Sequence, residues 1–294
     1  MPGAHALSFY EPAHLSVANN LSSSLLWKAH ERFGDYADQL LDNAQQSVRL
    51  LCEPTGLTLD GWVQDAGRSV VASAQDGNVI IKSPLVDGLN TILAIAGYSR
   101  AGSGPEAYAL SFGPSSPETM LQCAIAMQRV DGRYLHASER PTFDEIAQIV
   151  RLAGAVDLTQ LPLLPKFITL TDRLEIECVE ALRRANILGD TSAVDELSVL
   201  ASRINQNDRP TRICHGDLDM RNVLHQDGKI MVIDPEPLIA PQEFDAAKIT
   251  FSAGLCPEEV AEHLDLDVKL TVDLHRFFTI AGLLYSRVKG HAMS

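Results

Sequence analysis

The sequence has few of the features that mark secreted, membrane or nucleic-acid-binding proteins. Its five cysteines lie far apart and form no C-x-x-C pair, which argues against a disulfide framework or a thiolate zinc site. No apolar run approaches the length that a bilayer requires, and no secretory signal is visible at the N-terminus. Basic residues are also scarce: 24 Lys and Arg against 38 Asp and Glu leave a net charge of −14. Such a surface repels nucleic acid and anionic membranes. We therefore expect a cytoplasmic protein whose partner is a small molecule, preferably a cationic one.

The 294 residues have the composition of a globular protein, with 46% hydrophobic residues and a mean hydropathy of +0.00. Apolar residues at helical spacing predict one long helix or a helical pair over 25–51. Short β-prone runs at 70–71 and 79–81, separated by a Gln-Asp-Gly-Asn turn, predict a hairpin in an antiparallel sheet.

The pattern changes near residue 131, after a mostly apolar run over 119–130 that is typical of a buried strand. Beyond it, helical periodicity dominates at 143–152, 167–186 and 193–204. A strand-rich first part and a helix-rich second part predict an α+β protein of two lobes.

One segment of the second part carries the groups that phosphoryl transfer needs. The stretch H-G-D-L at 215–218 is followed by Asn222, and two β-prone runs around an Asp-Gly turn lead to Asp234. A hairpin of these runs brings Asp234 back beside Asp217 and Asn222. Asp217 would orient and deprotonate an attacking hydroxyl, and Asn222 and Asp234 would supply hard oxygen ligands for Mg²⁺. The alternative is that Asp217 and Asn222 are turn residues and His215 is an ordinary core histidine.

These residues resemble a known family. The stretches 215–218, 222–224 and 233–235, with the Glu-Phe-Asp-Ala-Ala sequence at 243–247, look like the aminoglycoside phosphotransferases. The resemblance is to the branch of streptomycin 6-kinases and hydroxyurea phosphotransferases, which also begins with a helical extension. It implies a protein-kinase-like bilobal fold, ATP and Mg²⁺, and transfer of the γ-phosphoryl group to a hydroxyl or amine of a small molecule.

The resemblance also assigns regions and roles. Residues 1–130 would hold the N-terminal helical extension and a small antiparallel-sheet lobe that binds ATP. Residues 131–294 would form the larger, mainly helical lobe with the catalytic loop and the acceptor site. Asp217 then matches the catalytic base, Asn222 and Asp234 match the metal ligands, and Asp245 matches an aspartate that braces the catalytic loop.

The same comparison indicates nucleotide-binding residues in the first part. Lys82 ends a β-prone run, where kinases place the lysine that holds the α- and β-phosphates. Gly67 and Ser69 precede the first strand of the predicted hairpin and could cover the phosphates with backbone N–H groups, although an ordinary turn has the same composition. The run ending in Gln128 to Val130 resembles the hinge between kinase lobes, whose backbone pairs with adenine.

Two departures from the family pattern bear on function. No glutamate follows Lys82 before Glu106, so either Asp87 takes its place or Lys82 is held in another way. Asp219 and Glu236 stand where the family usually has a histidine and a basic residue. Both would make the acceptor site more acidic and suit a cationic substrate. The alternative is that both carboxylates face solvent or pair with Arg221 and Lys248.

The sequence thus favours an ATP- and Mg²⁺-dependent kinase of an aminoglycoside-type antibiotic, a resistance enzyme. Two alternatives stay open. A kinase of a metabolite or of a natural-product intermediate would use the same residues, because acceptor specificity has no shared motif. A nucleotide-binding pseudokinase would account for the missing glutamate.

Overall fold

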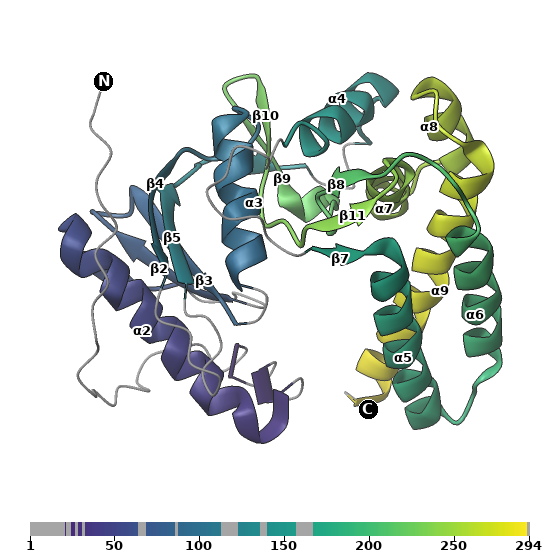
Figure 1. The fold of residues 1–294 in the computed structure, drawn as a ribbon, viewed down its shortest axis with the longest axis horizontal. Helices are drawn as coiled ribbons and strands as arrows, with labels where there is room; N and C mark the ends of the chain where they lie inside the picture. The colour runs from purple at the N-terminus through teal and green to yellow at the C-terminus, as the bar shows by residue number, and fades with distance from the viewer. Residues whose placement is uncertain are drawn as a thin grey trace. The chain divides into compact units, whose positions relative to one another are not determined.

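The computed structural model describes residues 21, 25–26, 29–30, 33–63, 69–85, 88–112, 123–135, 140–156 and 167–292 (Figure 1). The chain forms two compact units, one from the described residues up to Asp131 and one from those that begin at Gly132. Across these described stretches, no helix combines the length and the apolarity that crossing a bilayer demands.

The first unit is built on one antiparallel sheet in the order β1-β2-β3-β5-β4. Its strands are β1 (Leu59–Trp62), β2 (Ser69–Ala74), β3 (Val79–Pro84), β4 (Ala107–Phe112) and β5 (Cys123–Gln128). The predicted hairpin is confirmed as β2 and β3. Its turn is held by Asp60, whose carboxylate accepts hydrogen bonds from the N–H groups of Gly77 at 2.7 Å and Asp76 at 3.2 Å.

Two helices cover the two faces of this sheet (Figure 1). The helix α2 (Ala37–Thr55) packs on the face that carries Ala124 and Ala126, and α3 (Gly88–Arg100) packs on the face that carries Ile125 and Met127. This alternation along β5 explains why the strand is apolar on both sides. A short 3₁₀ turn, η1 (Gly34–Tyr36), precedes α2.

The predicted elements of the first unit differ from the observed ones mainly in length. The helix α2 runs four residues past the predicted end and stops at Gly56, whose φ of 68° is the left-handed cap that glycine adopts without strain. The strand β4 was not predicted, because its sequence Ala-Tyr-Ala-Leu-Ser-Phe lacks the β-branched residues that mark strands.

The second unit is mainly helical. Its helices are α4 (Phe143–Ala153), α5 (Leu170–Leu188), α6 (Ser192–Asn205), α7 (Glu243–Ala253), α8 (Pro257–His263) and α9 (Val268–Ala292). The long helix α9 packs against α5, α6, α7 and α8. Phe277 and Phe278 of α9 meet Phe244 of α7 in the core between them. The three helices predicted from periodicity are confirmed as α4, α5 and α6.

Two small sheets flank one loop of this unit. One sheet contains β7 (Ile168–Thr169), β11 (Leu238–Ala240) and β8 (Arg212–Cys214), and the other contains β10 (Lys229–Val232), β9 (Val223–Gln226) and β6 (Arg133–Tyr134). The strand β8 ends and β9 begins on either side of residues 215–222, whose last turn is the 3₁₀ helix η2 (Met220–Asn222). Both ends of this loop are therefore fixed by strand pairing. It is called the catalytic loop after the role that the family resemblance implies.

Candidate active site

The backbone at the start of the catalytic loop is held by a buried carboxylate. Asp245, in the first turn of α7, accepts hydrogen bonds from the N–H of His215 at 2.7 Å and from that of Gly216 at 3.1 Å. The carbonyl of His215 accepts from the N–H of Glu236 at 2.8 Å, and the imidazole Nε2 lies 2.9 Å from the carbonyl oxygen of Ile233. Burial raises the pKa of Asp245 to about 6, because losing water disfavours the ionised form more than the two N–H groups favour it.

Gly216 fills a position that no other residue fits. Its φ is +83°, in the left-handed region, and an added Cβ would lie 1.7 Å from the carbonyl oxygen of Glu236. The glycine of the H-G-D-L stretch is therefore required by the close approach of the two chain segments.

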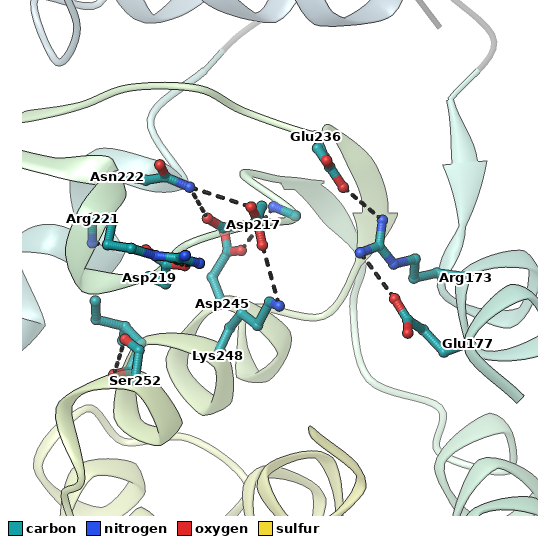
Figure 2. Close-up of polar contacts among 12 residues, drawn as sticks. Arg173, Glu177, Asp217, Asp219, Arg221, Asn222, Glu236, Asp245, Lys248 and Ser252 are labelled. Carbon is teal, nitrogen blue, oxygen red and sulfur yellow. Dashed lines mark hydrogen bonds and ion pairs between the residues drawn. The ribbon is translucent and has the colours of Figure 1, made fainter. Parts of the chain in front are cut away.

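Asp217 is held from two sides (Figure 2). The side-chain Nδ2 of Asn222 donates to the backbone carbonyl of Asp217 at 2.7 Å and lies 3.3 Å from its carboxylate Oδ2. The ammonium of Lys248 lies 3.2 Å from the other carboxylate oxygen, Oδ1. The Asp217 side chain is 26% exposed, so it is accessible to a ligand while it is held in place.

The hairpin predicted to return the chain to this loop is confirmed as β9 and β10. Its turn residues Asp227 and Gly228 have φ of 50° and 76°, the left-handed pair of a tight hairpin turn. Val232 is paired with Val223, and the N–H of Ile233 donates to the carbonyl of Asn222 at 2.9 Å.

Asp234 follows directly and so leaves the hairpin at the end where Asn222 enters it. Its side chain is exposed, and its φ of +59° is unusual for a residue other than glycine. Such a conformation persists only where the surrounding structure imposes it, and it occurs often at functional sites.

Asn222 and Asp234 offer the oxygen donors that Mg²⁺ prefers. Both hydrogen bonds of the Asn222 side chain to Asp217 use its nitrogen, which leaves the amide oxygen to act as a ligand. Within the described ranges, no group of three or more His, Cys, Asp or Glu side chains could hold a metal by itself. The donor set therefore fits a metal whose remaining ligands are phosphate and water oxygens.

The two acidic residues that depart from the family pattern are both paired with arginines. The carboxylate of Asp219 accepts from the backbone N–H of Arg221 at 2.7 Å and also from its guanidinium. Glu236 lies 3.0 Å from Arg173 of α5, whose other nitrogen contacts Glu177 at 3.1 Å. Of the two alternatives, ion pairing thus describes both carboxylates: Asp219 pairs with Arg221, and Glu236 pairs with Arg173, which the sequence did not indicate.

The first unit carries the other predicted residues. Lys82 is buried in β3 and shares the α3 face of the sheet with Ile80, and the sequence of α3 contains no acidic residue. Ser69 is buried at the start of β2. The N–H of Gln128 is already engaged with the carbonyl of Glu106 at 2.7 Å.

Val130 follows the end of β5, past the last paired residue of that strand. Two predicted positions, Gly67 and Asp87, lie outside the described residues. Lys82, Ser69, Gln128 and Val130 belong to the first unit, while Asp217, Asn222 and Asp234 belong to the second.

Two side chains at the loop were not singled out as site residues from the sequence: Lys248, beside Asp217, and Arg173, beside Glu236. Lys248 carried a usable signal. It follows Asp245 by three residues, which places both on one face of any helix that begins at the Glu-Phe-Asp-Ala-Ala stretch. Arg173 gave no such signal, because it is 63 residues away from its partner in the sequence.

Residues 98–254 match the sequence model of the phosphotransferase enzyme family, and this range is more than half of the chain and includes the whole catalytic loop. The chain belongs to this phosphotransferase family. Its enzyme class is small-molecule kinase. No curated protein sequence matches the chain. The narrower resemblance to streptomycin 6-kinases and hydroxyurea phosphotransferases therefore stays a prediction.

Solved structures with this fold are similar to this chain over most of its length. A choline/ethanolamine kinase family protein from Mesorhizobium loti has 14% identity and a TM-score of 0.56, covering 87% of this chain and 88% of that one. Choline kinase from Cryptosporidium parvum has 11% identity and a TM-score of 0.55, covering 85% and 89%. A thermostable mutant of aminoglycoside phosphotransferase APH(4)-Ia, bound to AMP-PNP and hygromycin B, has 16% identity and a TM-score of 0.53, covering 83% and 96%. The α+β, kinase-like fold expected from the sequence is thus confirmed.

Proposed function

We propose that this phosphotransferase uses ATP and Mg²⁺ to phosphorylate a hydroxyl or amine of a cationic small molecule of the aminoglycoside type. The observation that carries the proposal is the arrangement around Asp217. An accessible carboxylate is held by Asn222 and Lys248 at the mouth of a hairpin, and Asp234 leaves that hairpin at the same end. A carboxylate that orients the acceptor, next to oxygen ligands for a metal, is the arrangement that phosphoryl transfer from a nucleotide requires.

Each residue of the catalytic loop has a defined task in this proposal. Asp217 accepts the hydrogen bond of the acceptor hydroxyl and aligns its oxygen with the γ-phosphorus. Asn222 and Asp234 hold Mg²⁺, which offsets the charge of the nucleotide phosphates. Asp245 keeps the loop backbone in place through the N–H groups of His215 and Gly216.

The nucleotide contacts are proposed for the first unit. Lys82 holds the α- and β-phosphates, and the backbone from Gly67 to Ser69 covers them. Because the N–H of Gln128 is engaged with Glu106, adenine recognition falls to the Gln128 carbonyl and to the backbone of Val130. The assignments of Lys82, Ser69, Gln128 and Val130 rest on the family resemblance and on the position of each residue within the first unit. The assignment of Gly67 rests on the resemblance alone.

The cationic character of the acceptor is supported by the acidic surface of α5. A shallow hollow of about 410 Å³ on this helix is lined by Asp172, Glu175, Ile176, Val179 and Glu180. The first turn of the same helix reaches the catalytic loop region through the ion pair of Arg173 with Glu236. Asp172 accepts hydrogen bonds from Thr169 at the start of the helix, and Glu180 is paired with Arg183 and Arg184. Glu175, beside Ile176 and Val179, is therefore the carboxylate that we propose for an amine of the acceptor.

The test is a screen for transfer of radiolabelled γ-phosphate from ATP with the purified protein. The acceptors are streptomycin, kanamycin, hygromycin B and hydroxyurea, with choline, ethanolamine and sugar alcohols as the metabolite arm. Labelled product with an aminoglycoside supports the proposal, and labelling confined to choline or ethanolamine supports the metabolite kinase. Binding of ATP without any turnover, including hydrolysis, would identify a pseudokinase and reject both.

The Asp217→Asn variant is the matched control for this screen. It keeps the size of the side chain but removes the charged acceptor, so we expect kcat to fall by about 10²- to 10⁴-fold with little change in nucleotide affinity. Unchanged turnover in this variant would show that Asp217 does not contact the acceptor.

A further inference from the structure

Lys248 is fixed in place, unlike an ordinary surface lysine. Its ammonium lies 3.2 Å from Oδ1 of Asp217, and 20% of its side chain is exposed. On another side, the ammonium lies 5.1 Å from the centroid of the Phe278 ring. That ring is itself held edge-on against Phe244 in the core. A cation confined between a carboxylate and an aromatic face has little freedom to move away.

The helix α7 determines where Lys248 lies. Glu243, in its first turn, is anchored by Arg209 at 3.2 Å and by the N–H of Asp267 at 3.1 Å. Asp245 holds the loop backbone just before Asp217. Lys248 comes three residues later on the same helix face and holds the side chain of Asp217 itself. One rigid element therefore holds both the backbone and the carboxylate of the candidate catalytic residue.

The two oxygens of Asp217 are divided between two partners, as Figure 2 shows. Oδ2 is 3.3 Å from the amide nitrogen of Asn222, a long hydrogen bond, and Oδ1 is 3.2 Å from the ammonium of Lys248. The two partners differ in what else they do. Asn222 is also a candidate metal ligand, whereas the described carboxylate contact of Lys248 is with Asp217 alone. The Asp217 side chain is 26% exposed, so the hydroxyl of an acceptor can reach it.

We propose that Lys248 is a positioning residue for phosphoryl transfer, which keeps the Asp217 carboxylate turned toward the acceptor hydroxyl. The inference rests on the proposed function, in which Asp217 contacts the acceptor. In that step the acceptor oxygen forms a bond to the γ-phosphorus while the bond from that phosphorus to the β-phosphate oxygen breaks. ADP leaves with the electron pair, and the hydroxyl proton passes to Asp217 and then to solvent.

The experiment is a double-substitution cycle on Lys248 and Asp217. Four proteins are compared with the wild type: Lys248→Met, Lys248→Arg, Asp217→Asn, and the double variant with Lys248→Met and Asp217→Asn. Two reactions are followed, namely ATP hydrolysis, with water as acceptor, and transfer to whichever of streptomycin, kanamycin and choline reacts fastest. Lys269→Met is the matched control, because Lys269 is an exposed lysine of α9. Thermal unfolding establishes that each variant is folded.

We expect Lys248→Met to lower kcat by about 10- to 100-fold while the KM for ATP changes little, because a misplaced reacting group costs about this much. Methionine keeps the unbranched stem over Phe278 and loses the charge. Lys248→Arg should retain most of the kcat that Lys248→Met loses, since arginine keeps a cation next to Oδ1 of Asp217. In the Asp217→Asn background, Lys248→Met lowers kcat no further, because the group it positions is already gone.

Two results would overturn this role. One is a kcat for Lys248→Met close to that of Lys269→Met in a folded protein. The other is an equal loss from Lys248→Met with and without Asp217→Asn, which would mean that the lysine acts elsewhere. Should Lys248→Met fail to fold, Lys248→Gln takes its place in the cycle. Failure of the proposed function is distinct from both, since the wild type itself would then bind ATP without turnover or transfer phosphate only to choline or ethanolamine.

Discussion

Desolvation and hydrogen bonding have opposite effects on the pKa of the buried Asp245 carboxylate, and the net effect can be measured. Its pKa is raised from 3.8 to about 6, with burial as the largest cause and the N–H groups of His215 and Gly216 opposing it. A raised pKa means that the native state keeps this proton over a pH range where the unfolded chain has released it. The contribution of Asp245 to stability therefore falls as pH rises from 3.8 to about 6 and is constant above that.

The size of the effect follows from the shift. At about 1.36 kcal/mol per pH unit, the interval between the two pKa values corresponds to roughly 3 kcal/mol, of which about 2 kcal/mol lies above pH 4.5. The assay is urea unfolding of the wild type and of Asp245→Asn at pH 4.5, 6 and 7.5. The difference in unfolding free energy, wild type minus variant, should fall by about 2 kcal/mol over this range.

A difference that rises with pH would refute this reasoning. It would mean that the two N–H groups outweigh burial and that the pKa of Asp245 lies below its usual range. The same variant tests the role of Asp245 as a brace. An asparagine amide can accept from only one of the two N–H groups, and its own nitrogen faces the other, so we expect the loop to shift and kcat to fall by about 100-fold.

Three further results are expected. Asp234→Ala should abolish most turnover, and extra Mg²⁺ should recover little of it, because Asn222 alone is a neutral and weak ligand; normal turnover at ordinary Mg²⁺ would place the metal elsewhere. Gly216→Ala should destabilise the protein by about 2 kcal/mol or more and inactivate it, since its Cβ would meet the Glu236 carbonyl at a positive φ; an unchanged Tm would contradict this. The KM of an aminoglycoside should rise as ionic strength increases and the Debye length of the solution falls below about 10 Å, while the KM of ATP changes less. Glu175→Gln should weaken that salt dependence, and a KM that is indifferent both to salt and to this substitution would favour a neutral acceptor.

The sequence predicted the parts of the site that depend on local chain geometry. A tight Asp-Gly turn between two β-prone runs was sufficient to place Asp234 at the same end of the hairpin as Asn222. The glycine of the H-G-D-L stretch is required by a backbone contact with Glu236, and it belongs to the motif that identified the family. These features are carried by neighbours in sequence or by a motif, so pattern alone could find them.

Contacts between distant segments could not be predicted in this way. Arg221 and Lys248 were the partners that the sequence offered for Asp219 and Glu236, yet the side chain that reaches Glu236 is Arg173 of α5. The pairing depends on how β7 and β11 align α5 with the chain after the hairpin, and no local pattern encodes that alignment. The same limit explains why the sequence left open whether Glu236 is paired, whereas the pairing of Asp219 with Arg221, two residues away, was one of the stated alternatives.

The catalytic loop has little regular structure of its own, so its shape must come from the segments around it. Three side chains of α7 contact it in order: Asp245 at the N–H groups of His215 and Gly216, Lys248 at the Asp217 carboxylate, and Ser252 at the N–H of Met220, 3.1 Å away. Their spacing of three and then four residues is that of one helix face. The position of the loop is therefore set by a helix whose other faces are buried against α9 and α4. In the proposed function, acceptor preference can then change through α5 without disturbing the geometry of Asp217, because the proposal assigns the two roles to different helices.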